Sequence, residues 1–316
     1  MQSRAWCLLL VGGAALAASA PAPAPQPTAG PEAEIDLHET ARQLFDTFAP
    51  PEVKAQYDFP AREQWDAFAA RLQHALETED LSALAAYEPE ARAALAALRF
   101  FPDYADQAEW LEERLDYIEA AKEAVRRPPA LPPKPGAAPA PLPYYDLWLR
   151  RLQARPAPGR AAGLFPAVSR AFAAEGVPPQ LAWIAEVEST FNPAARSPVG
   201  AKGLFQLMPA TAQGLGLSTF LPDDRTDPEK SARATARYLH DLHDQFGDWP
   251  LALAAYNAGP GRVRRLLTGR HATTFAEIAP ALSAETRMYV PKVLAVVRVR
   301  TGLAPDRLPP PAGRRT

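Results

Sequence analysis

The sequence predicts a mainly α-helical protein, and three observations support this fold class. Apolar residues recur at spacings of three and four residues in several segments, which is the period of one helix face. The front half of the chain lacks the alternation of apolar and polar residues that is typical of strands. Glycine and proline stand where the helical patterns end or begin. With 47% apolar residues in a chain of 316, a sizeable core can form.

Residues 1–20 have the anatomy of a secretory signal peptide. Arg4 supplies a positive charge, an apolar run follows at residues 6–16, and small residues offer cleavage sites after Ala17 or Ala20. The apolar run is shorter than the roughly 20 residues that span a membrane. We therefore expect this segment to be removed, which leaves no stable membrane insertion; an uncleaved anchor is the alternative.

Cysteine usage and charge narrow the location and the partners. Cys7 is the only cysteine and lies inside the apolar run, so the exported chain would form no disulfide. Export without disulfides suits a periplasmic or secreted protein of the bacterial cell envelope. The net charge of −2 gives no electrostatic reason to bind nucleic acid or an anionic membrane surface. We expect no nucleic-acid partner.

Proline-rich segments divide the chain. The 36 prolines concentrate at residues 21–34 and 128–143, where an extended polyproline II conformation would make semi-rigid linkers. The linkers separate a helical N-terminal domain at 35–127 from a second folded region at 144–303. Residues 304–316 contain three successive prolines, and we expect them to form a flexible tail.

The N-terminal domain is expected to be helical because its apolar residues follow the helix period. No cluster of residues in this domain indicates a catalytic or metal site. We expect its aromatic residues to lie in a core and not on a glycan-binding surface. Its role and any protein partner stay unknown. The apolar stripes are Trp65, Phe68, Ala69, Leu72 and Leu76, and later Leu111, Leu115 and Ile118.

Helices of the region 144–303 carry clear end signals. Asp227 before a proline predicts a helix N-cap, and Gly176 and Gly247 predict helix ends. A proline pair opens another helix, since proline fits a first turn. The expected helices are residues 164–176, 179–189, 228–246, 250–256 and 284–300.

Glu188 is the strongest candidate for a catalytic residue. It shares one helix face with Leu181, Ile184 and Ala185, and a globular domain would bury that face. Burial disfavours the charged carboxylate and raises its pKa, and the position in the last helical turn acts in the same direction. Glu186 lies about 200° around the helix and is expected to face solvent. The alternative is a buried Glu188 paired with an arginine for structure.

Four separated motifs include or follow this glutamate. Residues 188–193 read Glu-Ser-Thr-Phe-Asn-Pro, residues 203–206 Gly-Leu-Phe-Gln, residues 255–259 Ala-Tyr-Asn-Ala-Gly, and residues 285–290 Glu-Thr-Arg-Met-Tyr-Val. With these motifs in this order, residues 160–300 resemble the soluble lytic transglycosylase (SLT-type) family. The resemblance implies a goose-lysozyme-like helical catalytic domain, peptidoglycan glycan strands as substrate, and no metal or organic cofactor.

The resemblance also implies roles for single residues. Glu188 matches the family's catalytic glutamate, and Phe205 stands in place of the usual methionine, a change that should affect packing and not activity. Each of these residues taken alone also has a purely structural interpretation. Tyr256 and Tyr289 could be core residues, Asn257 a helix C-cap and Gln206 a loop cap. The substrate-binding residues implied by the resemblance are Ser197, Gln206, Met208, Tyr256, Asn257, Glu285 and Tyr289.

The mechanism that the resemblance implies uses one acid. Neutral Glu188 protonates the glycosidic oxygen between N-acetylmuramic acid and N-acetylglucosamine, and its carboxylate then removes the C6 hydroxyl proton as a 1,6-anhydro ring closes. Ordinary glycosidases use two carboxyl groups, and the sequence offers no obvious second one. Two alternatives stay open: a muramidase that uses water, and a non-catalytic wall-binding scaffold.

Two other polar clusters have simpler explanations. His240 and His243 are flanked by aspartates, which favours a solvated helix face over a metal site. Asp223, Asp224 and Asp227 are expected to cap helices and form turns.

Overall fold

The computed structural model describes residues 71–72, 74–78, 80–99, 105–128, 142–197 and 200–313. Within these ranges the chain forms α-helices and short 3₁₀ helices, with two isolated β-bridges, Arg196 to Lys202 and Lys202 to Leu207. The predicted mainly α-helical fold is confirmed for this part of the chain. The expected signal peptide and the first proline-rich segment lie outside the described residues. The α-helices are α4 (Leu81–Ala85), α5 (Glu88–Leu98), α6 (Ala105–Arg126), α7 (Tyr145–Leu152), α8 (Ala161–Ala174), α9 (Ile184–Ser189), α10 (Pro209–Gly214), α11 (Pro228–Phe246), α12 (Trp249–Ala258), α13 (Pro260–Arg270), α14 (Phe275–Ile278) and α15 (Ala284–Thr301), and the 3₁₀ helices are η2 (Pro179–Trp183), η3 (Asp224–Thr226), η4 (Ala279–Ala281) and η5 (Pro305–Arg307).

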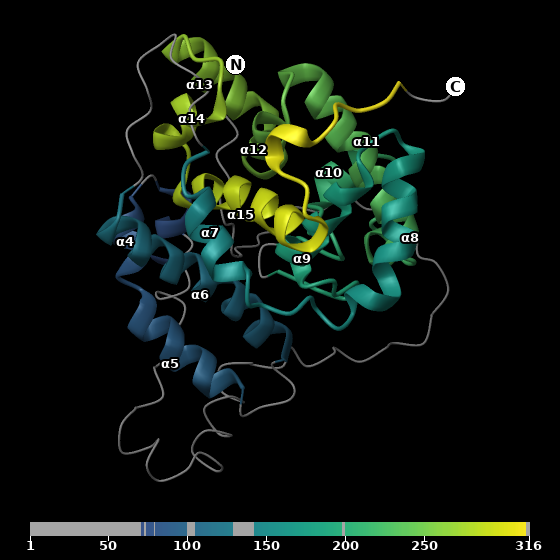
Figure 1. Cartoon of the computed structure of the whole chain (residues 1–316). Coiled ribbons are helices and arrows are strands. Elements are labelled where there is room, and N and C mark those ends of the chain that lie inside the picture. Colours follow the sequence, from purple (N-terminus) through teal and green to yellow (C-terminus); the bar gives the residue numbers. More distant parts are fainter. Residues whose placement is uncertain are drawn as a thin grey trace, which may run out of the picture.

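Helix α15 lies at the centre of the fold, with α7, α9 and α12 around it (Figure 1). From Ala284 to Val297 every residue except Glu285 is buried. A helix that is buried on all sides belongs to the core of a domain, so α15 is the element against which the others are positioned. No helix within the described residues is both long and apolar enough to cross a bilayer.

The predicted capping signals act as expected. The Asp227 carboxylate accepts hydrogen bonds from the backbone N–H groups of Glu229 and Lys230, each at 2.9 Å, and so starts α11. Gly247, with φ of 84°, ends that helix in the left-handed conformation. These contacts confirm the interpretation of Asp227 as a cap.

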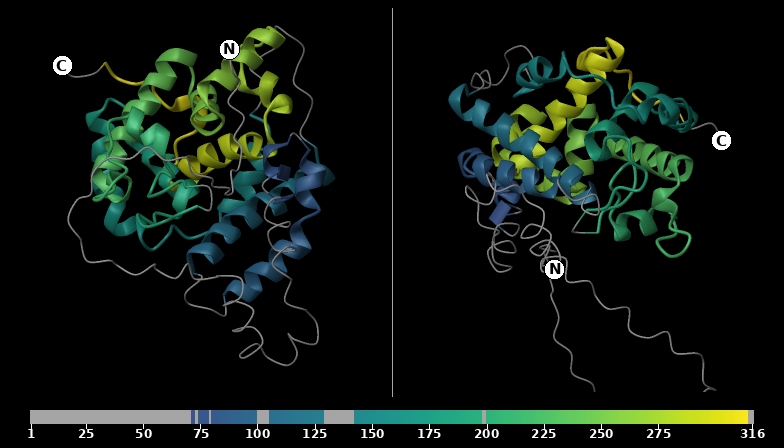
Figure 2. Two further views of the ribbon diagram at one scale, coloured as in Figure 1. Left: turned by 180° about the vertical axis from the view of Figure 1, so that it is seen from behind. Right: turned by 90° about the horizontal axis from the view of Figure 1, so that it is seen from below.

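Helix α6 packs on the second region of the chain. Its predicted stripe of Leu111, Leu115 and Ile118 is buried, and α6 contacts both α7 and α15. One continuous hydrophobic core holds these residues together with Trp148 of α7. Helix α6 packs beside α15, and α4 and α5 pack on α6 (Figure 1 and Figure 2). The domain boundaries stay predictions, but the proline-rich segment does not hold the two described regions apart.

The expectation of a flexible tail is wrong for residues 304–313. The backbone N–H of Ala312 donates to the Gly176 carbonyl at 2.8 Å, and the Trp249 indole donates to the Pro309 carbonyl at 2.8 Å. Leu308 is buried. Because a proline carbonyl still accepts hydrogen bonds, a proline-rich segment can be docked where a surface offers donors.

His240 does not lie on a solvated face either. It is only 6% exposed, and its ring nitrogens contact the Ala312 carbonyl at 3.1 Å and the Asp244 carboxylate at 3.2 Å. The docked tail covers this face of α11, which the pattern of charges along the helix did not show. His243 packs against the Trp249 ring, with centroids 4.4 Å apart.

Candidate active site

Glu188 occupies the last turn of α9. The 3₁₀ helix η2 opens after Pro178, as the sequence predicts, and leads directly into α9. The predicted apolar face of Leu181, Ile184 and Ala185 is fully buried. Thr190, with φ of 52°, ends the helix in the left-handed conformation and turns the chain away. Glu188 is therefore held at the end of a short buried helix.

The Glu188 carboxyl contacts the Tyr289 hydroxyl, which donates a hydrogen bond to Oε1 at 2.5 Å. Burial raises the pKa of Glu188 to about 8, and the negative charges of Glu113 and Glu285 act in the same direction. The hydrogen bond from Tyr289 and the charge of Arg114 oppose this shift. Glu188 is consequently protonated at neutral pH and meets a phenolic donor ready to stabilise its carboxylate.

Glu186, expected to face solvent, is instead part of a buried ion pair. Both of its carboxylate oxygens accept from the Arg300 guanidinium, at 2.9 and 2.7 Å, and its side chain is 8% exposed. The structural role considered for Glu188, a buried glutamate paired with arginine, thus belongs to its neighbour. The helix period placed Glu186 on the far side of α9 correctly, but α15 covers that side.

Gln206 comes to the same pocket as Glu188. It lies in the loop between α9 and α10 with φ of 45°, and its Nε2 donates to the Gly203 carbonyl at 3.0 Å. The Tyr256 hydroxyl donates to the Phe205 carbonyl at 2.8 Å, so α12 fixes the backbone beside Gln206. The structure therefore links two of the sequence motifs directly.

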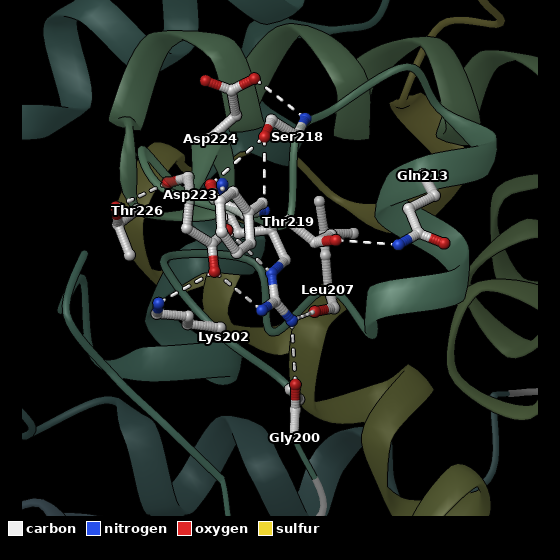
Figure 3. Close-up of polar contacts among 12 residues, drawn as sticks. Gly200, Lys202, Leu207, Gln213, Ser218, Thr219, Asp223, Asp224 and Thr226 are labelled. Carbon is white, nitrogen blue, oxygen red and sulfur yellow. Dashed lines mark hydrogen bonds and ion pairs between the residues drawn. The ribbon is translucent and has the colours of Figure 1, made fainter. Parts of the chain in front are cut away.

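A polar network holds the other end of this loop (Figure 3). The buried Arg225 guanidinium donates to the carbonyls of Gly200 at 2.9 Å and Leu207 at 3.1 Å, and it pairs with Asp223 at 2.8 Å. Lys202 also pairs with Asp223, at 2.9 Å. Arg225 thereby satisfies loop carbonyls, of which that of Leu207 also accepts the Lys202 N–H at 3.3 Å, and Asp223 does more than the predicted capping.

The remaining predicted site residues are not among those that line the pocket at Glu188. Ser197 accepts the Ala201 N–H at 3.0 Å and stabilises a turn, and Met208 precedes α10 as its N-cap residue. Asn257 does not cap a helix; its Oδ1 accepts from the Thr286 hydroxyl at 2.6 Å and ties α12 to α15. Glu285, half-buried in the first turn of α15, acts on Glu188 through its charge.

The pocket at Glu188 contains three residues that the sequence analysis did not select. Glu109, Trp110 and Glu113, all from α6, line it together with Glu188 and Gln206. Its volume is about 10 Å³, which is room for one water molecule. The complete lining is Glu109, Trp110, Glu113, Glu188, Ser189, Asn192, Ala195, Arg196 and Gln206.

Glu113 is, with Glu109, one of two further carboxyl groups at this pocket that the sequence did not reveal. Its side chain is 14% exposed, and burial raises its pKa to about 7. A signal was present in the sequence: Trp110, Glu113 and Tyr117 follow one another at spacings of three and four, beside the buried stripe of α6. A glutamate on such a face is either paired or functional.

A larger cavity, of about 790 Å³, is bordered by two of the same glutamates. Glu109 and Glu113 border it together with side chains of α5 and the segment 152–159. Side chains of both charges line this cavity: Arg92, Arg99 and Lys292 are basic, and Glu119 is acidic. Glu113 therefore stands between this cavity and the Glu188 pocket.

Comparison with known proteins identifies a family for one part of the chain. Residues 167–278 match the family model described as the transglycosylase SLT domain. This range contains Glu188, Gln206 and Tyr256, but neither α6 nor Tyr289. The chain thus contains an SLT-type lytic transglycosylase domain.

Relatives match somewhat more than a third of the chain. The soluble lytic murein transglycosylase of Salmonella typhimurium is 45% identical over 122 residues, which cover 35% of this chain and 19% of that protein. The membrane-bound lytic murein transglycosylase D of Escherichia coli is 38% identical over 126 residues, which cover 38% of this chain and 27% of that protein. The chain thus spans a fifth to a quarter of the length of these relatives.

Among solved structures, the 70 kDa soluble lytic transglycosylase of Escherichia coli aligns with 88% of this chain and 48% of its own, at 23% identity and a TM-score of 0.42. An inactive mutant of the lytic transglycosylase Slt from Pseudomonas aeruginosa aligns with 86% of this chain and 47% of its own, at 24% identity and a TM-score of 0.41.

Proposed function

We propose that this protein is a lytic transglycosylase that cleaves the β-1,4 bond between N-acetylmuramic acid and N-acetylglucosamine in peptidoglycan, without water, to leave 1,6-anhydromuramoyl ends. The domain match and the names of the relatives support the reaction class. The observation that carries the proposal is the half-buried Glu188 carboxyl with the Tyr289 hydroxyl at 2.5 Å.

The first step requires Glu188 as an acid. Its pKa of about 8 keeps roughly nine-tenths of the side chain protonated at pH 7. The proton passes to the glycosidic oxygen, the bond from that oxygen to C1 of the muramoyl unit breaks, and the N-acetylglucosamine part leaves as an alcohol. An acid with a pKa near the working pH is suited to this transfer.

The second step requires the same residue as a base. The muramoyl acetamido group stabilises the positive charge left at C1, and the Glu188 carboxylate removes the proton from the C6 hydroxyl. The C6 oxygen then bonds to C1 and closes the anhydro ring, which returns Glu188 to its protonated form. Between the steps Tyr289 stabilises the carboxylate; burial raises the pKa of Tyr289 well above 10, so it stays a donor.

One alternative has an observation in its favour. Glu113 lines the same pocket, so the absence of a second carboxyl group no longer counts against hydrolysis. In a muramidase, the carboxylate of Glu113 would activate a water molecule while Glu188 protonates the leaving oxygen. Reducing ends in the product would then replace anhydromuramoyl ends.

The test is mass spectrometry of purified sacculi digested with the full chain lacking residues 1–20. We expect anhydromuramoyl products, and Glu188→Gln should lower the rate by about 10² to 10⁴, the range for losing a general acid–base group. The matched control is Glu229→Gln on the exposed side of α11, with unchanged activity. Substantial activity in Glu188→Gln would overturn the assignment, and reducing ends from the unmodified protein would establish hydrolysis.

Location and substrate are linked in this proposal. Peptidoglycan lies outside the cytoplasmic membrane, so we propose that the expected signal at residues 1–20 directs the chain to the periplasm. Peptidoglycan glycan strands are the proposed partner.

A further inference from the structure

Helix α6 reaches the Glu188 pocket from outside the part of the chain that matches the SLT domain. The match covers residues 167–278, whereas α6 is Ala105–Arg126. Three of the nine residues that line the pocket, Glu109, Trp110 and Glu113, come from this helix. The surroundings of Glu188 are therefore incomplete without an element that the family comparison does not include.

Two hydrogen bonds attach α6 to the chain that follows Glu188. The Thr190 hydroxyl donates to Oε1 of Glu113 at 3.2 Å, and the Asn192 amide donates to Oε2 of Glu109 at 2.9 Å. Thr190 and Asn192 lie two and four residues after Glu188. The turn that ends α9 is thus tied to α6 at two points.

The Glu113 carboxyl is held in one orientation. Oε1 accepts from Thr190, while Oε2 accepts from the Arg114 guanidinium at 3.2 Å. Arg114 is itself placed over the Trp110 ring, 4.9 Å from its centroid. Fixed partners on both oxygens leave the carboxyl little rotational freedom beside the pocket.

Charged and titratable groups surround Glu188 from three helices and one loop. From α6 come Glu109, Glu113, Arg114 and Tyr117; from α15 come Glu285 and Tyr289; from α12 comes Tyr256; and Arg196 lines the pocket from the loop after α9. Arg114 and Tyr289 lower the pKa of Glu188, while Glu113 and Glu285 raise it. Of the two carboxylates, Glu113 lines the pocket itself.

We propose that Glu113 is a positioning residue for Glu188: its carboxylate, fixed by Thr190 and Arg114 at the pocket wall, keeps the proton on Glu188 until a substrate oxygen accepts it. The physical reason is that two carboxylates in one water-poor pocket resist simultaneous ionisation. This inference rests on the proposed function, in which Glu188 must enter the reaction protonated.

The test compares kcat/KM against pH for the unmodified protein and Glu113→Gln. Removing the Glu113 charge lowers the pKa of Glu188, so the alkaline limb of the profile moves to lower pH. If the pKa falls by roughly 0.5 to 1, the protonated fraction at pH 8 drops from about a half to between a quarter and a tenth, a two- to fivefold loss of activity. At pH 6 the two proteins should be about equally active.

Two variants control the experiment. Glu112→Gln changes the neighbouring residue on α6, whose side chain is 59% exposed and pairs with Arg99, and its profile should match that of the unmodified protein. Glu113→Asp keeps the charge and should restore most of the alkaline limb. Equal denaturation midpoints establish that each variant is folded.

A titration that does not depend on activity separates this inference from the proposed function. In protein labelled with ¹³C at the glutamate carboxyl carbon, Glu188→Gln identifies the Glu188 signal, and Glu113→Gln should shift its midpoint to lower pH. An unshifted midpoint would overturn the inference, as would a loss of activity at every pH, which would make Glu113 catalytic. A shifted midpoint together with an active Glu188→Gln would support the role of Glu113 and overturn the proposed function alone.

Discussion

Replacing Asp116 by asparagine measures how firmly α6 is attached to the second region of the chain. Asp116 is 8% exposed in the middle of α6. Its carboxylate pairs with Lys292 of α15 at 2.8 Å, with Arg151 of α7 at 3.0 Å, and with Arg155 at 2.9 Å. The substitution keeps the shape of the side chain and removes the charge that three cations share.

The expected loss of unfolding free energy depends on which partners each cation keeps when the Asp116 charge is removed. Arg155 is 42% exposed and can be hydrated, and Arg151 keeps Glu119 as a partner at 2.7 Å. Lys292 is 5% exposed, and within the described residues it keeps the faces of the Tyr117 and Trp148 rings, 4.3 and 4.9 Å away, and the charge of Glu113. A buried charge deprived of its partner costs about 3–5 kcal/mol, so we expect the free energy of unfolding to fall by that amount.

Urea denaturation followed by tryptophan fluorescence measures this difference, because Trp148 is buried beside Lys292. At about 2–4 °C per kcal/mol, the melting temperature should fall by roughly 6–20 °C. The control is Glu123→Gln, which removes a partly exposed pair with Arg150 and should cost under about 1 kcal/mol. A loss below 1 kcal/mol in Asp116→Asn would refute the reasoning, since it would show that Lys292 does not depend on this carboxylate.

The pH dependence of the same difference has a definite sign. Burial opposes ionisation of Asp116, but the charges and hydrogen bonds of Lys292 and Arg155 prevail and hold its pKa well below the usual range. A depressed pKa stabilises the folded state above the unfolded value of about 3.9. The difference between the two proteins should therefore be constant from pH 8 to about pH 5 and shrink as the pH falls further.

Two further substitutions test the catalytic loop and the acid. Gly203→Ala places a Cβ 1.8 Å from the Arg225 carbonyl oxygen at a φ of +80°. It should lower the free energy of unfolding by at least about 2 kcal/mol and lower kcat/KM by displacing Gln206. The control Gly163→Ala, with open space around its Cβ in α8, should leave the free energy of unfolding unchanged or raise it by up to about 1 kcal/mol. Tyr289→Phe removes the hydrogen bond that lowers the pKa of Glu188, so kcat should fall while the alkaline limb moves to higher pH; a limb that moves to lower pH would contradict the assigned contact.

Local features of the structure were predictable because their causes are local. The N-cap at Asp227 and the helix end at Gly247 depend on side chains and backbone conformations within a few residues. The position of Glu188 beside the buried face of its helix followed from the spacing of Leu181, Ile184 and Ala185, which are all buried. The motif at 203–206 pointed to the loop that reaches the pocket.

Features that depend on distant partners were not predictable in the same way. Glu186 was expected in solvent because the helix period indicates only the side of α9 that it occupies. The period does not indicate that Arg300, 114 residues later in the chain, lies on that side. The docked tail over His240 and the contact of Glu113 with Thr190 are of the same kind.

The sequence by itself determined the helical fold class of the described chain, the ends of helix α11 at Asp227 and Gly247, and the choice of Glu188 over other carboxyl groups as the candidate acid. Only the tertiary structure decided that α6 completes the pocket, that Glu109 and Glu113 bring further carboxyl groups to it and that Glu186 is structural. Periodicity and capping are set by interactions within a few residues, whereas the pKa and the partner of a buried carboxyl depend on whichever elements pack against it. Those elements come from parts of the chain that no local pattern connects.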